Sequence, residues 1–290
     1  MRSLLFVPAH EAKKLKKALG CSADVMIIDL EDAVPEFEKT NARSMCFDFL
    51  SEHQHGSKLV VRINALASSY ALEDLKVVVK ARPWGVMLPK CESVQDVIAL
   101  DQQLGELENA YSIERNSIKI FPIVTETAQS IFGLSTYGHY KGSRLSGMLW
   151  GGEDLAADVG SISNRDQNQA YTSPYLLARS LTLFAASCAK VLAIDAVYTN
   201  YRDMQGLKEE ALAALRDGFS AKAAIHPDQV AVINEVFTPS DEDLLKAAEI
   251  IATFKKIPTA GAVSFEGKML DLPHLKSAQR LLQRAQVKTQ

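Results

Sequence analysis

Two segments, Ile123-Val124-Thr125-Glu126-Thr127-Ala128 and Trp150-Gly151-Gly152-Glu153-Asp154-Leu155, give the clearest indication of the fold. In each, an apolar run gives way to threonine or glycine and then to a carboxylate, which is typical of a parallel strand that ends at the mouth of a barrel. Carboxylates at neighbouring strand ends, with room left for waters and a substrate oxygen, suit Mg²⁺. The pair Glu126 and Asp154 therefore predicts metal-assisted chemistry.

The rest of the chain repeats this alternation of short apolar runs and longer amphipathic segments. We expect strands at Ser3–Pro8, Val25–Leu30, Leu59–Ile63, Gly85–Leu88, Ile118–Val124, Gly147–Trp150, Leu192–Val197 and Lys222–Ile225. We expect helices at Glu11–Leu19, Glu36–Phe49, Leu72–Lys80, Val94–Leu107, Ala128–Tyr137, Pro174–Lys190, Gly206–Arg216 and Pro227–Phe237. Strands that are each followed by a helix predict an α/β fold of the (β/α)8, or TIM barrel, type. A doubly wound open sheet is the weaker alternative, because its phosphate-binding fingerprint G-x-G-x-x-G is absent.

The chain continues beyond the eighth strand–helix unit. Ser240–Lys255 predicts a further helix, Ile257–Gly267 a loop, and Leu275–Arg284 a last amphipathic helix. No repeat, low-complexity tract or linker separates a second globular domain. We therefore expect a barrel over residues 1–238 and a C-terminal helical arm and lid over residues 239–290.

Composition and charge exclude several classes of function. The 290 residues are 47% hydrophobic, and 32 basic against 35 acidic residues give a formal charge of −3. This balance indicates no surface for nucleic acid and none for a membrane. The apolar run in Met1–Pro8 is too short for a signal peptide, and no apolar stretch approaches about 18 residues. We expect a cytoplasmic protein whose partners are small molecules or proteins.

In a barrel of this kind, function lies at the carboxyl ends of the strands. Asp29, Glu31 and Asp32 are too close together for all three to be ionised without a cation nearby, because like charges raise one another's pKa. Arg62, at the end of the third strand, is their natural partner. The other polar residues at predicted strand ends are His10, Asn64, Lys90, Glu126, Glu153, Asp154, Asp195, Tyr198 and His226.

Eight motifs, in order along the chain, resemble the citrate lyase β-subunit-like family of the HpcH/HpaI aldolase/citrate lyase superfamily. They are Arg2–Pro8, Asp29–Val34, Val61–Asn64, Leu88–Lys90, Glu126–Ala128, Gly151–Leu155, Ile225–Pro227 and Gly267–Asp271. The family comprises the Mg²⁺-dependent malyl-CoA, citramalyl-CoA and citryl-CoA lyases. The resemblance implies a TIM barrel and a lyase that splits a 3-hydroxy-3-carboxyacyl-CoA thioester into a 2-oxo acid and a shorter acyl-CoA.

The resemblance also implies the residues that carry the chemistry. Glu126 and Asp154 match the Mg²⁺ ligands of the family. Arg62 matches the arginine that faces the thioester carbonyl, where negative charge grows as the carbon–carbon bond breaks. Glu31 and Asp32 would orient Arg62 and a metal-bound water.

Further positions would contact the substrate. Arg62 and Glu126 belong to this set. The substrate carboxylate would be received by the backbone amides of Gly152 and Glu153. Lys13 and Lys17, four residues apart, match positions that contact CoA phosphates, although a solvated helix face is the alternative. Ala9-His10 replaces the Gly-Asn that is usual in the family, so the placement of CoA is open.

Asp271 matches the family's acid that protonates the enolate carbon, acting from a C-terminal lid that can belong to a neighbouring subunit. Its alternative role is a helix cap, because it precedes Leu272-Pro273 at the start of the last predicted helix. The family habit implies a homo-oligomer, a trimer or a hexamer.

These observations together lead us to expect a Mg²⁺-dependent lyase of the malyl-CoA or citramalyl-CoA type that releases a 2-oxo acid and acetyl-CoA. One alternative is the β subunit of a citrate lyase complex, which works with partner subunits on a thioester carried by an acyl carrier protein. The others are a class II pyruvate-type aldolase without CoA, and a non-catalytic family member that binds CoA esters. Retention of Arg62, Glu126, Asp154 and Asp271 argues against the non-catalytic reading.

Overall fold

The computed structural model describes residues 1–53, 58–256 and 261–286. Contacts between residues divide the chain into two units, Met1–Asn234 and Glu235–Gln290. The expected functional division into residues 1–238 and 239–290 stays a prediction. No helix in the described ranges is long and apolar enough to cross a membrane.

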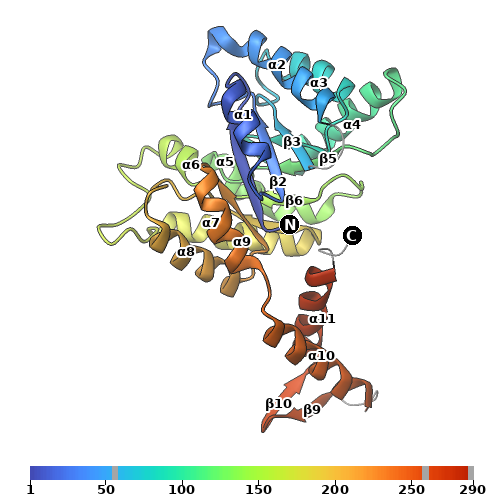
Figure 1. Ribbon diagram of the computed structural model, residues 1–290, viewed down its shortest axis with the longest axis vertical. Coiled ribbons are helices and arrows are strands. Elements are labelled where there is room, and N and C mark those ends of the chain that lie inside the picture. The colour runs from blue at the N-terminus through green and yellow to red at the C-terminus, as the bar shows by residue number, and fades with distance from the viewer. Residues whose placement is uncertain (54–57, 257–260, 287–290) are drawn as a thin grey trace. The chain divides into compact units, whose positions relative to one another are not determined.

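The first unit is built on a parallel sheet. Its strands are β1 (Ser3–Pro8), β2 (Val25–Asp29), β3 (Lys58–Arg62), β4 (Gly85–Leu88), β5 (Lys119–Pro122), β6 (Gly147–Leu149), β7 (Leu192–Asp195) and β8 (Ala221–Ala224). All of the expected strands are present, with ends shifted by at most two residues. Figure 1 shows these strands at the centre of the unit with helices around them.

The sheet closes on itself. Its strand order is β5-β4-β3-β2-β1-β8-β7-β6. The two end strands are joined by the parallel bridges Ile120↔Leu145 and Ile123↔Leu149, and the N–H of Val124 donates to the C=O of Leu149 at 2.9 Å. The (β/α)8 barrel is confirmed.

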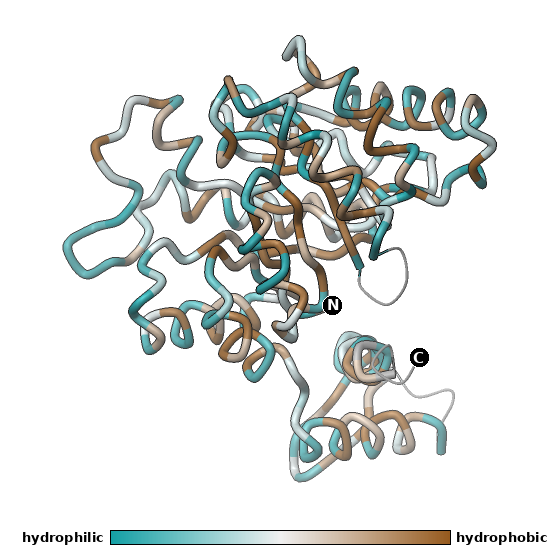
Figure 2. The backbone as a smooth tube through the Cα atoms, turned by 45° about the horizontal axis from the view of Figure 1, so that its top comes forward, coloured by the Kyte–Doolittle hydropathy of each residue, from teal (hydrophilic) through white to brown (hydrophobic). Residues whose placement is uncertain are grey.

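Apolar side chains fill the barrel. The buried cluster at its centre consists of Leu4, Val25, Ile27, Val60, Met87, Phe121, Ile123, Leu149, Ile194, Ala221 and Ala223. β2 is buried along its whole length, as expected for a strand that is covered on both faces. Figure 2 shows the hydrophobic segments gathered in these central strands. The interior is therefore a packed core, which leaves the strand ends for chemistry.

Helices follow the strands as expected, with local differences. They are α1 (Ala12–Leu19), α2 (Lys39–Glu52), α3 (Ala71–Lys80), α4 (Val94–Ala110), α5 (Ala128–Gly133), α6 (Glu153–Asp158), α7 (Ser173–Ala189), α8 (Met204–Asp217) and α9 (Pro227–Phe237), with 3₁₀ segments η1 (Glu36–Glu38) and η2 (Leu134–His139). The segment Ala128–Tyr137 is helical as predicted, but it changes from α to 3₁₀ geometry at Leu134. The α-helix ends at Gly133, where a Cβ atom would lie 1.8 Å from the carbonyl oxygen of Glu92. The short helix α6 was not predicted.

The second unit contains α10 (Asp241–Lys256), β9 (Ala262–Phe265), β10 (Lys268–Asp271) and α11 (Leu272–Gln286). The expected loop over Ile257–Gly267 was wrong where the structure describes it, and residues 257–260 lie outside the described ranges. β9 and β10 form an antiparallel hairpin whose two turn residues, Glu266 and Gly267, both have positive φ, as a tight hairpin turn requires. Val263 and Leu270 pack with Phe254 in a small core of this unit.

Candidate active site

A cavity of about 310 Å³ opens at the carboxyl ends of the barrel strands. Its apolar wall consists of Phe6, Pro8, Ala33, Ile123, Leu149, Trp150, Ala196, Val197 and Ile225. The rest of its lining consists of Asp29, Asp32, Arg62, Glu126, Gly151, Gly152, Glu153 and Asp154. The structure thus brings together the predicted residues Asp32, Arg62, Glu126, Gly152, Glu153 and Asp154 around one space.

Arg62 is fixed by the acids that follow β2. Asp29 and Arg62 are register partners in the neighbouring strands β2 and β3. The Arg62 Nε and Nη2 atoms donate to the two carboxylate oxygens of Asp29 at 2.7 and 2.6 Å. Its Nη1 atom lies 3.0 Å from Glu31 Oε2 and 3.9 Å from Asp32 Oδ2. The expected pairing of Arg62 with these three acids is confirmed, and the bidentate contact fixes the plane of the guanidinium.

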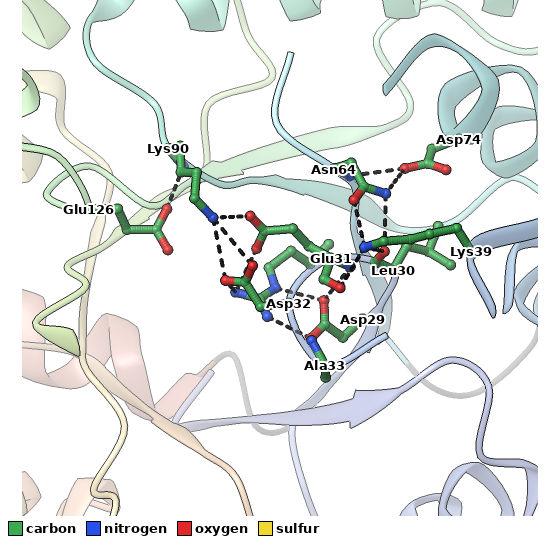
Figure 3. Close-up of polar contacts among 11 residues, drawn as sticks. Asp29, Leu30, Glu31, Asp32, Ala33, Lys39, Asn64, Asp74, Lys90 and Glu126 are labelled. Atoms are coloured by element: carbon green, nitrogen blue, oxygen red, sulfur yellow. Dashed lines mark hydrogen bonds and ion pairs between the residues drawn. The ribbon is translucent and has the colours of Figure 1, made fainter. Parts of the chain in front are cut away.

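Asp29 also shapes the loop after β2. Its carboxylate accepts the backbone N–H groups of Glu31 at 2.9 Å and Ala33 at 3.3 Å. Lys39 supports the same loop by donating to the C=O groups of Leu30 and Glu31 at 2.8 and 2.7 Å, as Figure 3 shows. The sequence analysis gave no role to Lys39. No local pattern distinguishes it from any lysine at the start of a helix.

Lys90 connects two sides of the site (Figure 3). Its backbone N–H donates to Glu126 Oε2, and its ammonium donates to Glu31 Oε1. Asp32 Oδ2 lies 3.4 Å from the same ammonium. The sequence analysis placed Lys90 at a strand end without assigning it a role. Glu31 does not line the cavity and reaches the site through Arg62 and Lys90.

Glu126 is a buried carboxyl, only 3% exposed. Burial raises the pKa of this carboxyl to about 8; the nearby charges of Asp154 and Glu31 act in the same direction, whereas the N–H of Lys90 and the charge of Arg62 oppose the rise. A carboxyl in this state would be stabilised as its anion by a bound cation.

Asp154 is the second candidate oxygen ligand. Its carboxylate lines the cavity, and within the described part of the chain it has no hydrogen-bond donor and no ion-pair partner. Among the described residues there is no ready cluster of three or more His, Cys, Asp or Glu side chains. Mg²⁺ needs none, because it usually takes one or two carboxylates and completes its octahedron with water and substrate oxygens. Glu126 and Asp154 therefore fit this ion.

The turn between β6 and α6 is built on two glycines. A Cβ atom on Gly151 would lie 2.8 Å from Glu126 Cγ, and one on Gly152 would lie 2.9 Å from Cζ3 of Trp150. Only glycine allows this approach of the backbone to both side chains. Beyond the turn, Glu153 Oε1 accepts a hydrogen bond from Asn164 at 2.8 Å, a contact that the sequence analysis missed because Asn164 lies in an irregular loop.

The model of the family described as HpcH/HpaI aldolase/citrate lyase matches residues 2–227. The chain belongs to this family. It is 33% identical to the mitochondrial citramalyl-CoA lyase of Rattus norvegicus, covering 97% of this chain and 85% of that protein. It is 36% identical to the citrate lyase subunit beta-like protein of Mycobacterium tuberculosis, covering 97% and 94%. Because such relatives are named lyases, the chain is classed as a lyase of the same family.

A solved structure of this family carries the ligands that the site suggests. The crystal structure of the CitE protein from Mycobacterium tuberculosis in complex with magnesium, acetoacetate and coenzyme A has a TM-score of 0.77 to this chain, at 34% identity and 98% coverage of both chains. This mycobacterial protein thus binds magnesium and coenzyme A on a similar fold.

The predicted CoA contacts lie outside the cavity. Lys13 and Lys17 are exposed on α1, which begins directly after β1, and neither forms an ion pair or a side-chain hydrogen bond with the described residues. Pro8, at the end of β1, lines the cavity. Their role in this family member stays a prediction.

Asp271 lies in the second unit, where it ends β10 and directly precedes α11. Its Oδ1 atom lies 2.6 Å from Nδ1 of His274, three residues into the chain that follows. This position agrees with the capping alternative. The role of Asp271 as proton donor also stays a prediction. A position at the start of a helix does not exclude that role.

Asp195 was expected among the polar residues at the strand ends, but it does not line the cavity. It is buried, and it accepts hydrogen bonds from Lys222 at 2.7 Å, Arg179 at 2.9 Å and the indole N–H of Trp150 at 2.8 Å. Asp195 and Lys222 face the surrounding helices, where Arg179 of α7 and Glu210 of α8 complete their ion pairs. Asp195 therefore acts on the cavity only through Trp150, a lining residue whose indole N–H it binds.

Proposed function

We propose that this chain is a Mg²⁺-dependent carbon–carbon lyase that cleaves a 3-hydroxy-3-carboxyacyl-CoA thioester of the malyl-CoA or citramalyl-CoA type to a 2-oxo acid and acetyl-CoA. The observation that carries the proposal is that the Arg62 guanidinium and the Glu126 and Asp154 carboxylates face one cavity. The name of the rat relative and the magnesium and coenzyme A bound to the mycobacterial structure support it.

Glu126 and Asp154 are the residues that would hold the metal. Bound there, Mg²⁺ would supply Lewis-acid chemistry, acidifying the substrate hydroxyl and polarising the oxygen of the nascent 2-oxo acid. The backbone amides of Gly152 and Glu153 lie at the end of the adjoining turn, where α6 begins, and would receive the substrate carboxylate. The chain's own contribution is to hold these groups at fixed places before the substrate arrives.

Arg62 would stabilise the charge that develops on the acyl-CoA half. As the acidified hydroxyl gives its proton to water and becomes the 2-oxo group, the carbon–carbon bond breaks and its electron pair moves onto the thioester as an enolate, whose oxygen becomes negative. Asp29 occupies Nε and Nη2 of Arg62, which leaves the Nη1 edge to donate to that oxygen. Asp29 holds the guanidinium in this orientation, while Glu31 and Asp32 lie beside it and would act on the substrate only through Arg62.

Asp271 would complete the reaction by protonating the enolate carbon, which yields acetyl-CoA. The donor would be the Asp271 of a neighbouring copy in a homo-oligomer, a trimer or hexamer. Lys13 and Lys17 would receive the CoA phosphates as point charges.

The cavity lining favours a small apolar group on the substrate over a second carboxylate. Five lining side chains are carboxylates, and Arg62 is the one cation among the described lining residues. The additional carboxylate of a citryl thioester would meet these acids or the apolar wall, where an unpaired charge is costly. A malyl and a citramalyl thioester differ by a methyl group, worth only about 1–3 kcal/mol in such a pocket.

The β subunit of a citrate lyase is the second candidate, because the mycobacterial relative is named after it. Such a subunit would act with partner subunits on a citryl thioester of an acyl carrier protein. A non-catalytic member that binds CoA esters is a third reading, but a binder has no need of an arginine fixed on Asp29 and directed at a metal site.

The test is to incubate the protein with Mg²⁺ and malyl-CoA, citramalyl-CoA, citryl-CoA or citryl-loaded acyl carrier protein, and to quantify both the acetyl thioester and the 2-oxo acid. The proposal requires both products from at least one of the first two esters. Cleavage confined to citryl-loaded acyl carrier protein would favour the second candidate. Tight binding of the esters without any cleavage would favour the third.

A further inference from the structure

Lys90 touches both sides of the site in an unusual backbone conformation. Its φ of +50° lies in the left-handed region, which residues with a side chain rarely adopt. In this conformation the backbone N–H faces Glu126 after β5, while the ammonium reaches Glu31 in the loop after β2. Figure 3 shows Lys90 between these two carboxylates.

Glu31 is shared between two cations. The carboxylate is only 5% exposed. Its Oε1 atom accepts from Lys90, and its Oε2 atom lies 3.0 Å from Nη1 of Arg62 but makes no hydrogen bond. The carboxylate is therefore hydrogen-bonded to Lys90 and only adjacent to Arg62.

The state of Nη1 matters because it is the remaining donor edge of Arg62. Asp29 takes the Nε and Nη2 donors. Nη1 makes no hydrogen bond within the described residues, although Glu31 lies close enough to accept one. A small rotation of the Glu31 carboxylate would occupy this edge.

We propose that Lys90 is a positioning residue that holds the Glu31 carboxylate back and so keeps Nη1 of Arg62 open to the thioester carbonyl. This inference rests on the proposed function. If the Lys90 ammonium is removed, Glu31 keeps one ion-pair partner within 4 Å among the described residues, and that partner is Arg62. Hydrogen bonds between charged groups are short and strong, so Glu31 would close onto Nη1 and compete with the substrate.

The kinetic test uses Lys90→Met, Glu31→Gln and the double variant. Lys90→Met is expected to lower kcat by about 10-fold or more with little change in KM, because the lost donor acts on charge that develops during the reaction. The double variant is expected to recover most of that loss, since the neutral amide oxygen of glutamine accepts from Nη1 more weakly than a carboxylate does. Lys76→Met is the matched control, because it removes an exposed Lys–Glu pair on α3.

The double variant separates positioning from mere structural support. If Lys90 only stabilised the fold, the double variant would be at least as impaired as Lys90→Met, and that result would overturn the inference. An unchanged kcat in Lys90→Met would also overturn it. Should Lys90→Met not fold, Lys90→Gln replaces it, with the same recovery required on adding Glu31→Gln.

A crystal structure of Lys90→Met tests the positioning without any assay of turnover. The Glu31 carboxylate is expected to accept a hydrogen bond from Nη1 of Arg62. Its persistence at the wild-type position would overturn the inference. If the wild-type protein cleaves no CoA ester, the proposed function fails, while this structure still decides whether Lys90 keeps the Glu31 carboxylate from accepting a hydrogen bond from Nη1 of Arg62.

Discussion

At the scale of single residues, the site depends on how each charge is held. Arg62 is bound by Asp29 through two parallel hydrogen bonds, a geometry that a lysine cannot reproduce, because its ammonium is a point charge on a flexible stem. Both groups come from adjacent strands in register, so the barrel itself sets their distance. The orientation of the free Nη1 edge follows from this pairing.

Arg62→Lys keeps the charge and loses the fixed geometry. We expect kcat to fall by roughly 10²-fold, the scale observed when one oxyanion donor is removed. Steady-state kinetics on the cleaved ester measure this, with the exposed Arg216→Lys as control. A change confined to KM would mean that Arg62 anchors the substrate and that the enolate is stabilised elsewhere.

At the scale of elements, the turn between β6 and α6 packs against Glu126, one of the two candidate metal ligands. Gly151→Ala would place a methyl group 2.8 Å from Glu126 Cγ and push that carboxylate aside. We expect Mg²⁺ affinity, measured by calorimetry, to weaken by about 10-fold or more, the usual effect of disturbing the support of a ligand. Gly20→Ala, whose methyl would make ordinary contact, should leave it unchanged. Equal affinities would remove Glu126 from the ligand set.

Strands β7 and β8 are joined by a buried ion pair with a predictable response to pH. Burial alone would raise the pKa of the Asp195 carboxyl, but the charges of Lys222 and Arg179 outweigh it and hold that pKa below its usual value. A lowered pKa stabilises the fold above the unfolded pKa of about 4, and the stabilisation is lost as the pH falls through the folded pKa.

Asp195→Asn should therefore lower the free energy of unfolding at pH 7 by about 3–5 kcal/mol, because it leaves buried cations short of a partner. The difference from wild type should shrink below about pH 4, where the wild-type carboxylate also loses its charge. Urea unfolding from pH 3 to pH 7 measures both, with the exposed Asp48→Asn as control. A difference that stays constant with pH would contradict this account.

The sequence predicted the barrel because its signal is local and repeated: each buried strand reads as an apolar run, as β2 does. It also predicted that Glu126, Asp154 and Arg62 lie close together, since polar residues that follow such runs meet at one end of a barrel. It could not predict the contacts of Lys90 or Asn164. These depend on a left-handed backbone and on an irregular loop, which leave no periodic pattern.

The hairpin of β9 and β10 shows the opposite limit. An alternation of apolar and polar residues over only four positions does not distinguish a strand from a loop. The turn at Glu266 and Gly267 was therefore included in a predicted loop. The signal that could have revealed it was Gly267 between two short runs with apolar residues at alternate positions.

At the scale of the whole molecule, the proposed reaction needs Asp271 from the second unit. If Asp271 donates the proton across a subunit interface, Asp271→Asn should retain folding, Mg²⁺ binding and oligomer size while nearly eliminating cleavage. Mixing it with Arg62→Ala under subunit exchange should restore part of the activity, since some interfaces would combine an intact barrel with an intact lid.

Two results would contradict this arrangement. If hetero-oligomers form without recovery of activity, Asp271 acts within its own chain. If Asp271→Asn alone is fully active, Asp271 is not the proton donor, and its contact with His274 at the start of α11 is only structural.

The central claim is that Glu126 and Asp154 hold a catalytic Mg²⁺ in a CoA-thioester lyase. The measurement that tests it most directly is acetyl-CoA release from citramalyl-CoA and malyl-CoA by protein stripped with EDTA, before and after Mg²⁺ is restored, for the wild type and Asp154→Ala. We expect no release without metal, full release by the wild type with Mg²⁺, and no rescue of Asp154→Ala at ordinary Mg²⁺ concentrations. Full activity of the metal-free wild type, or of Asp154→Ala, would contradict the account.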